Sequence, residues 1–136
     1  MSVLTPEKAL KILDDAPEQH HFRLYMGTNI KNLKELAEAL EIMADRSFSH
    51  HVSPTKNDFS SWIKEVVGDH QLADRVSGME SKKKMVKEIR KRVSSLEKRS
   101  SEHALLKTDY MKLGANDFAV GIVVGFIIGV VIAAVM

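Results

Sequence analysis

The chain has 136 residues, 44% of them apolar and 28% charged, with 20 Lys and Arg against 18 Asp and Glu. This length leaves room for one small folded domain and excludes a second catalytic domain. The sequence contains no cysteine, which excludes disulfides, thiol nucleophiles and thiolate metal sites. Residues 1–78 hold 9 basic and 12 acidic side chains, whereas residues 79–112 hold 11 and 5. We therefore expect an acidic head followed by a basic neck.

The N-terminal segment predicts a short helix and a strand. Thr5 is a favourable helix cap, and Pro6 occupies the first helical position, where its missing N–H costs nothing. Pro17 ends this helix. Residues 21–26 alternate between apolar and polar side chains, which is typical of a half-buried strand, and Gly27 closes it as a turn. Whether a second short strand follows is open.

The next segment predicts four helices. Asn32 caps the first, which carries apolar residues at i, i+3 and i+4 spacing. A short helix over residues 46–52 is broken by Pro54. Asn57 or Asp58 caps the third, which ends at Gly68, and a fourth runs over residues 69–78. The fold class is therefore mainly α: a helical head at residues 1–78 with one or two short strands.

Residues 79–113 predict a basic helical stalk. No proline or glycine occurs between Met79 and Met111, so a continuous helix would be about 50 Å long. Four apolar residues follow the 3-4-3 spacing of coiled-coil a and d positions, which predicts loose pairing of the stalk between two copies. These residues are Val86, Ile89, Val93 and Leu96.

Residues 114–136 predict a membrane anchor. Phe118 to Met136 carries no charge, and as a helix it would span roughly 28 Å, close to the hydrocarbon thickness of a bilayer. A buried helix of a soluble protein is the competing interpretation. Small residues recur every fourth position and predict helix–helix association in the membrane. They are Gly121, Gly125, Gly129 and Ala133.

The basic neck predicts the orientation of this anchor. Lys98, Arg99, Lys107 and Lys112 lie within about 20 residues of the apolar segment, where basic side chains resist translocation. Since no residue follows Met136, we expect a single-pass, tail-anchored protein with its N-terminal head in the cytoplasm.

Four residues of the head are candidates for recognition: His50, His51, Asp58 and Trp62. Adjacent residues on a helix point about 100° apart, which disfavours a metal ion shared by the two histidines. We expect instead that one histidine bonds the cap at Asn57–Asp58. Convergence of Asp45, Asp58 and Asp69 stays open, although aspartate before a helix is more commonly a cap.

The head carries no enzyme motif. A nucleophile elbow, a phosphate-binding glycine loop and a dinucleotide fingerprint are all missing from the sequence. We therefore expect a protein that is not an enzyme, with no cofactor and no small-molecule substrate.

The stalk contains a run of basic residues that could contact an anionic partner: Lys82, Lys83, Lys84, Lys87, Arg90 and Lys91. An acidic protein, RNA or anionic lipid would fit, and a simply solvated face is the competing interpretation. No aromatic residue is interleaved to stack on bases, so nucleic acid is the disfavoured partner.

The stretch from Phe22 to Ala73 resembles an uncharacterised prokaryotic, largely archaeal, family of small helical domains. The resemblance is carried by several separate anchors: Lys31 to Leu36, Phe48 with His50 to Val52, Asn57 to Phe59 with Trp62-Ile63, and Gly68-Asp69 with Leu72-Ala73. It implies a folded cytosolic head and no assigned activity, and it leaves the stalk and the tail outside.

The sequence favours a non-enzymatic scaffold or adaptor that self-associates through its membrane helix and presents a recognition head to a protein partner. The alternative is a small oligomeric pore or membrane-remodelling subunit. A metal-dependent or hydrolytic enzyme in the head is a third possibility. A membrane-fusion helix is disfavoured, because two heptads are too few to form a stable bundle.

Overall fold

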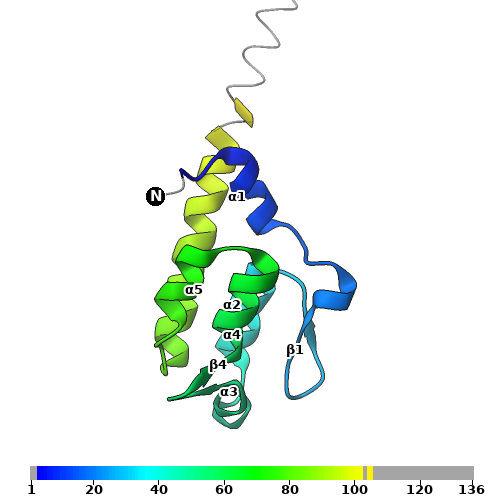
Figure 1. The fold of residues 1–136 in the computed structure, drawn as a ribbon, viewed down its shortest axis with the longest axis vertical. Helices are drawn as coiled ribbons and strands as arrows, with labels where there is room; N and C mark the ends of the chain where they lie inside the picture. The colour runs from blue at the N-terminus through cyan, green and yellow to red at the C-terminus, as the bar shows by residue number, and fades with distance from the viewer. Residues whose placement is uncertain (1–2, 103, 106–136) are drawn as a thin grey trace, which may run out of the picture. The chain divides into compact units, whose positions relative to one another are not determined.

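The computed structural model describes residues 3–102 and 104–105 (Figure 1). The chain divides after Ser100 into two compact units. Within the described residues, no helix is both long enough and apolar enough to cross a bilayer. The predicted transmembrane helix at residues 118–136, with its stripe of small residues, lies outside them.

The first unit is mainly helical, with two short hairpins. Its elements in chain order are α1 (Pro6–Leu13), η1 (Glu18–His20), β1 (Phe22–Arg23), β2 (Asn29–Ile30), α2 (Leu33–Ile42), α3 (Asp45–His51), β3 (Val52–Ser53), β4 (Lys56–Asn57), α4 (Asp58–Trp62), the π-helical turn η2 (Ile63–Val67) and α5 (His70–Val76). A last helix begins at residue 82. Its portion within this unit, residues 82–100, is called the basic helix below.

Short polar side chains set the helix starts, as the sequence predicted. The Thr5 hydroxyl accepts a hydrogen bond from the Lys8 N–H at 3.2 Å, and Asn32 accepts one from the Glu35 N–H at 2.9 Å. Of the two candidates for the cap of α4, the structure uses Asn57, whose side chain accepts from the Ser60 N–H at 3.0 Å. Each cap satisfies a backbone donor that the first helical turn leaves unpaired.

The two hairpins are shorter and more numerous than predicted. In the first, Phe22 pairs with Ile30, and the expected strand at residues 21–26 is cut to two residues because the chain turns at Gly27 (φ 92°). In the second, Val52 pairs with Asn57 around Pro54. Sequence alternation cannot reveal strands of two residues, so this second hairpin was not predicted.

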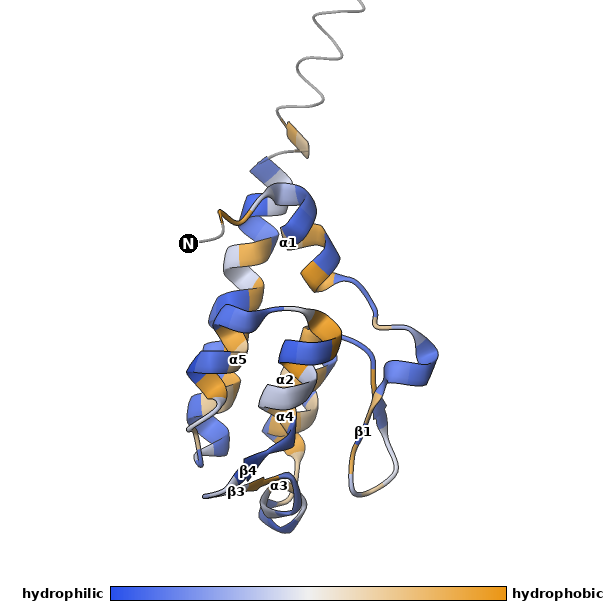
Figure 2. Ribbon diagram, viewed as in Figure 1, coloured by the Kyte–Doolittle hydropathy of each residue, from blue (hydrophilic) through white to orange (hydrophobic). Residues whose placement is uncertain are grey.

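The core lies where α2, α4, α5 and the basic helix bury their apolar sides. Figure 2 shows apolar and hydrophilic residues alternating along these helices, as expected for amphipathic segments. Among the fully buried side chains are Leu33, Leu36, Leu40, Phe59, Ile63, Leu72, Val76, Met85, Ile89 and Leu96.

The basic helix belongs to the head, which corrects the predicted boundary after residue 78. Ile89 and Leu96 are fully buried and Val93 is 8% exposed, all within the same hydrophobic cluster as α2 and α5. Val86 packs against that cluster. Three of the four residues predicted to pair between copies, Ile89, Val93 and Leu96, are therefore buried in the core of their own head. Heptad spacing identifies an apolar stripe, but it does not say which surface covers that stripe.

A buried ion pair joins the basic helix to α5. Arg92 donates to both carboxylate oxygens of Asp69, Nε to Oδ2 at 2.7 Å and Nη2 to Oδ1 at 3.0 Å. The two side chains are 9% and 2% exposed. Asp69 also caps α5 by accepting from the Leu72 N–H at 3.1 Å. One carboxylate therefore starts α5 and holds the basic helix against it.

Exposed ion pairs flank this buried one. Arg75 of α5 donates to Glu88 at 2.8 Å, and this hydrogen bond holds the pKa of Glu88 below its usual range. Arg90 pairs with Glu41 of α2 across the opposite side of the basic helix. Exposed pairs of this kind contribute little to stability compared with a buried, doubly hydrogen-bonded pair.

We predict that Arg92→Met destabilises the head by about 3 kcal/mol, because the Asp69 charge would stay buried without its partner. Arg90→Met, the matched control on the same helix, should cost under about 1 kcal/mol because its ion pair is exposed. Urea unfolding of the full chain in detergent, followed by the fluorescence of the one tryptophan, Trp62, measures both. Equal losses in the two variants would contradict the role of the buried pair.

Candidate groove between the first hairpin and the α2–α3 junction

A groove of about 590 Å³ opens between the tip of the β1–β2 hairpin and the junction of α2 with α3. Its lining is mainly apolar, and three large apolar side chains stand exposed at it: Tyr25 at 50%, Met26 at 78% and Ile42 at 87%. The remaining lining residues are Leu24, Thr28, Ala39, Met43, Ala44, Arg46 and Ser47. Grouped apolar exposure of this kind marks an interaction surface more often than scattered single residues do.

The tight turn of the hairpin presents Tyr25 and Met26 to the groove. The Leu24 N–H donates to the Thr28 carbonyl at 2.8 Å, and the Gly27 N–H donates back to the Leu24 carbonyl at 2.8 Å. Leu24 itself is buried, so it anchors the hairpin to the core. The two residues after it lie in the turn and have no core position to occupy.

The opposite wall is formed where α2 ends at Ile42, with Met43 as its C-cap, and α3 starts after Ala44. Lys82 of the basic helix holds this junction. Its Nζ donates to the Met43 carbonyl and lies 2.9 Å from a carboxylate oxygen of Asp45. Lys82, which the sequence assigned to contact with an anionic partner, is thus engaged within the head.

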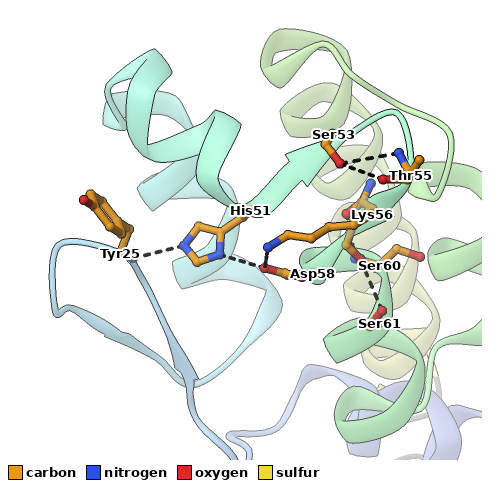
Figure 3. A network of polar contacts seen from close by, with 9 residues as sticks. Tyr25, His51, Ser53, Thr55, Lys56, Asp58, Ser60 and Ser61 are labelled. Atoms are coloured by element: carbon orange, nitrogen blue, oxygen red, sulfur yellow. Dashed lines mark hydrogen bonds and ion pairs between the residues drawn. The ribbon is translucent and has the colours of Figure 1, made fainter.

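A polar network holds the hairpin to the neighbouring elements (Figure 3). The Tyr25 N–H donates to Nε2 of His51 at 3.0 Å, and Nδ1 of His51 lies 3.1 Å from Oδ2 of Asp58. The same oxygen of Asp58 lies 3.2 Å from Nζ of Lys56. His51 is 5% exposed, so the network joins the first hairpin to α3, α4 and β4 through a buried ring.

The hydrogen-bond partners fix the tautomer of His51. A backbone N–H can only donate, so Nε2 must accept and the proton must reside on Nδ1, which donates to Asp58. Neither nitrogen is left to accept a substrate proton or to bind a metal ion. Across the described residues, no cluster of three His, Asp or Glu side chains could hold a metal. The geometry assigns His51 a structural role.

The other predicted recognition residues divide between core and surface. Trp62 is buried, and its Nε1 donates to the His20 carbonyl at 2.8 Å, which attaches η1 to α4. Asp58 is engaged by His51 and Lys56. His50 is exposed and packs against Tyr25 in a tilted arrangement, with ring centroids 4.3 Å apart, so it alone of the four lies beside the groove on the surface.

Sequence reasoning missed the groove itself. The alternation over residues 21–26 predicts Met26 on the same side of a strand as Phe22 and Leu24, whereas β1 already ends at Arg23. Ile42 lies outside the apolar stripe of α2, and this position could have indicated the groove. It is a large apolar residue at the end of a helix and away from the helix's buried face.

Residues 17–113 of the chain match a family of unknown function, DUF5752. The chain belongs to this family. The match extends beyond the stretch from residue 22 to 73 and includes the basic helix, as expected for a helix that completes the core. No curated protein and no solved structure matches the chain.

We predict that His51→Ala destabilises the head by about 2–3 kcal/mol, because the Tyr25 N–H and Asp58 each lose a buried partner and a ring-sized cavity forms. His50→Ala should cost less than about 0.5 kcal/mol, because His50 is exposed. Urea unfolding of the two variants measures this difference. If His51→Ala unfolded at the same urea concentration as His50→Ala, the buried network would not support the hairpin.

Proposed function

We propose that the protein is a membrane-tethered recognition module, a non-enzymatic adaptor whose head binds an apolar segment of a partner protein. The groove is the observation that carries this proposal, since it exposes Tyr25, Met26 and Ile42 together. The His51 network supports it, because a buried ring and a carboxylate are used to hold one wall of the groove in place.

The lining of the groove favours a particular partner chemistry. Arg46 is exposed at the groove, and within the described part of the chain it forms no ion pair. An arginine beside apolar side chains favours a segment in which large apolar residues are accompanied by Asp or Glu. We propose a short acidic-apolar segment of another protein as the occupant.

The apolar tail supplies the tether in this proposal. A head that binds one short segment has modest affinity, and several heads held together at a membrane raise the effective concentration for a multivalent partner. The stripe from Gly121 to Ala133 is the proposed contact between tails, since small residues let two helices approach closely in lipid.

A peptide display selection on the full chain in nanodiscs tests the groove. We expect enriched peptides to combine large apolar residues with Asp or Glu. Ile42→Asp should weaken their binding by about tenfold, because it places a charge at the apolar wall. Leu10→Asp is the matched control, since Leu10 is also exposed, at 53%, but lies on α1 away from the groove lining. Selected peptides that ignore Ile42→Asp would contradict the proposed site.

The self-association of the tail is tested separately. We predict that Gly125→Leu abolishes oligomers of the full chain in mild detergent, because a large side chain prevents close helix approach. Val124→Leu, one position away on a different side of the helix, should leave them intact. Light scattering with correction for bound detergent gives the mass. An unchanged mass for Gly125→Leu would remove the glycine stripe from the proposal.

A further inference from the structure

The basic helix carries an uncompensated stripe of lysines along its outer side. Lys83, Lys87 and Lys91 recur every four residues, so they lie along one line, and Lys84 falls within roughly 100° of arc from them. All four are exposed. The buried residues of this helix, Met85, Ile89 and Leu96 among them, occupy the opposite side.

The ion pairs of the head leave this stripe positive. Three other cations of the helix are engaged by the head: Lys82 by Asp45, Arg90 by Glu41 and Arg92 by Asp69. The two acidic residues of the basic helix form ion pairs with other helices of the head. Glu88 pairs with Arg75 of α5, and Glu97 pairs with Lys34 of α2.

The four stripe lysines form no ion pair among the described residues. Lys87 and Lys91 add only a longer-range attraction to Glu88, which Arg75 already neutralises. The stripe is therefore a continuous positive face, produced by packing the helix on the head.

We infer that the head lies with the basic helix flat on an anionic membrane leaflet, held there by Lys83, Lys84, Lys87 and Lys91. An upright helix would bring only its end near the lipid, because the attraction decays over a Debye length of about 8 Å. A helix lying in the plane brings all four ammonium groups to the headgroups at once. Because the head covers the inner side of the basic helix, only the side that carries the four lysines can face the lipid.

This inference rests on the proposed membrane tether. The linker between the head and the apolar tail is short. Only seventeen residues separate Ser100 from Phe118, so an inserted tail would keep the stripe at high local concentration beside the leaflet. Nucleic acid offers the same phosphate charge, but no aromatic residue accompanies the stripe between Lys82 and Ser100.

Spin labelling of the full chain tests the orientation, and the absence of native cysteine makes single labels straightforward. Ser94→Cys places a label on the exposed side of the basic helix, and Gln19→Cys places a control label on exposed η1. In nanodiscs with about 30% phosphatidylglycerol, access of a water-soluble relaxation agent to position 94 should fall roughly threefold relative to phosphatidylcholine. Position 19 should not change.

A charge-matched pair of variants tests the lysines themselves. Lys87→Glu with Lys91→Glu should abolish the protection at position 94, whereas Lys11→Glu with Lys64→Glu, an equal charge change at exposed positions elsewhere, should preserve it. High salt should also remove the protection. Equal access in both lipids, or loss of protection in both variants, would overturn the inference.

Two further measurements separate the possible failures. Extraction of the full chain from membranes by alkaline carbonate would overturn the proposed tether itself. Retention in the membrane with lipid-independent access at position 94 would overturn only the flat orientation. Protection produced by RNA in neutral nanodiscs, but not by phosphatidylglycerol, would assign the lysine stripe to nucleic acid instead.

Discussion

A buried ion pair and the apolar stripe around it decide the organisation of this protein. Arg92 reaches from the basic helix to Asp69, which at the same time caps α5. A buried charge is costly unless its partner is fixed, so this contact selects one register of the basic helix against the head. Ile89 and Leu96 then complete the core on either side of Arg92. Without this helix, the apolar sides of α2 and α5 would lack a cover.

The same packing determines what the surface presents. Because the inner side of the basic helix is used by the core, polar residues at its sides can form ion pairs with the head, as Lys82, Glu88 and Arg90 do. The four lysines of the stripe are exposed outside these pairs. At its N-terminal end, Lys82 holds the α2–α3 junction, which forms one wall of the groove. A single helix thus supports both surfaces on which the proposed function depends.

The groove and the lysine stripe have separate roles in the proposed function. In this proposal the stripe and the tail set the position of the head at the membrane, while the groove selects the partner. His51 belongs to neither surface, yet its ring holds Tyr25, a wall of the groove, to α4 through Asp58. A histidine beside an aspartate is a common catalytic pair, but His51 has a structural role because both of its ring nitrogens are engaged in hydrogen bonds within the head.

The sequence by itself determined the features that depend on neighbours along the chain. Thr5, Asn32 and Asp69 cap helices because a short polar side chain reaches an N–H three residues ahead, and this geometry is local. The apolar character of residues 118–136 is likewise readable from the sequence, although their structure lies outside the described residues.

The tertiary structure decided which surface covers each apolar stripe. The heptad pattern of the basic helix fits another copy and the head of its own chain equally well. Contacts distant in sequence, among them the Arg92–Asp69 pair, place the helix against its own head. The groove depends on Met26 and Ile42, separated in sequence and brought together by the fold. Periodicity reports that a side chain is apolar, but burial depends on long-range contacts that no local pattern encodes.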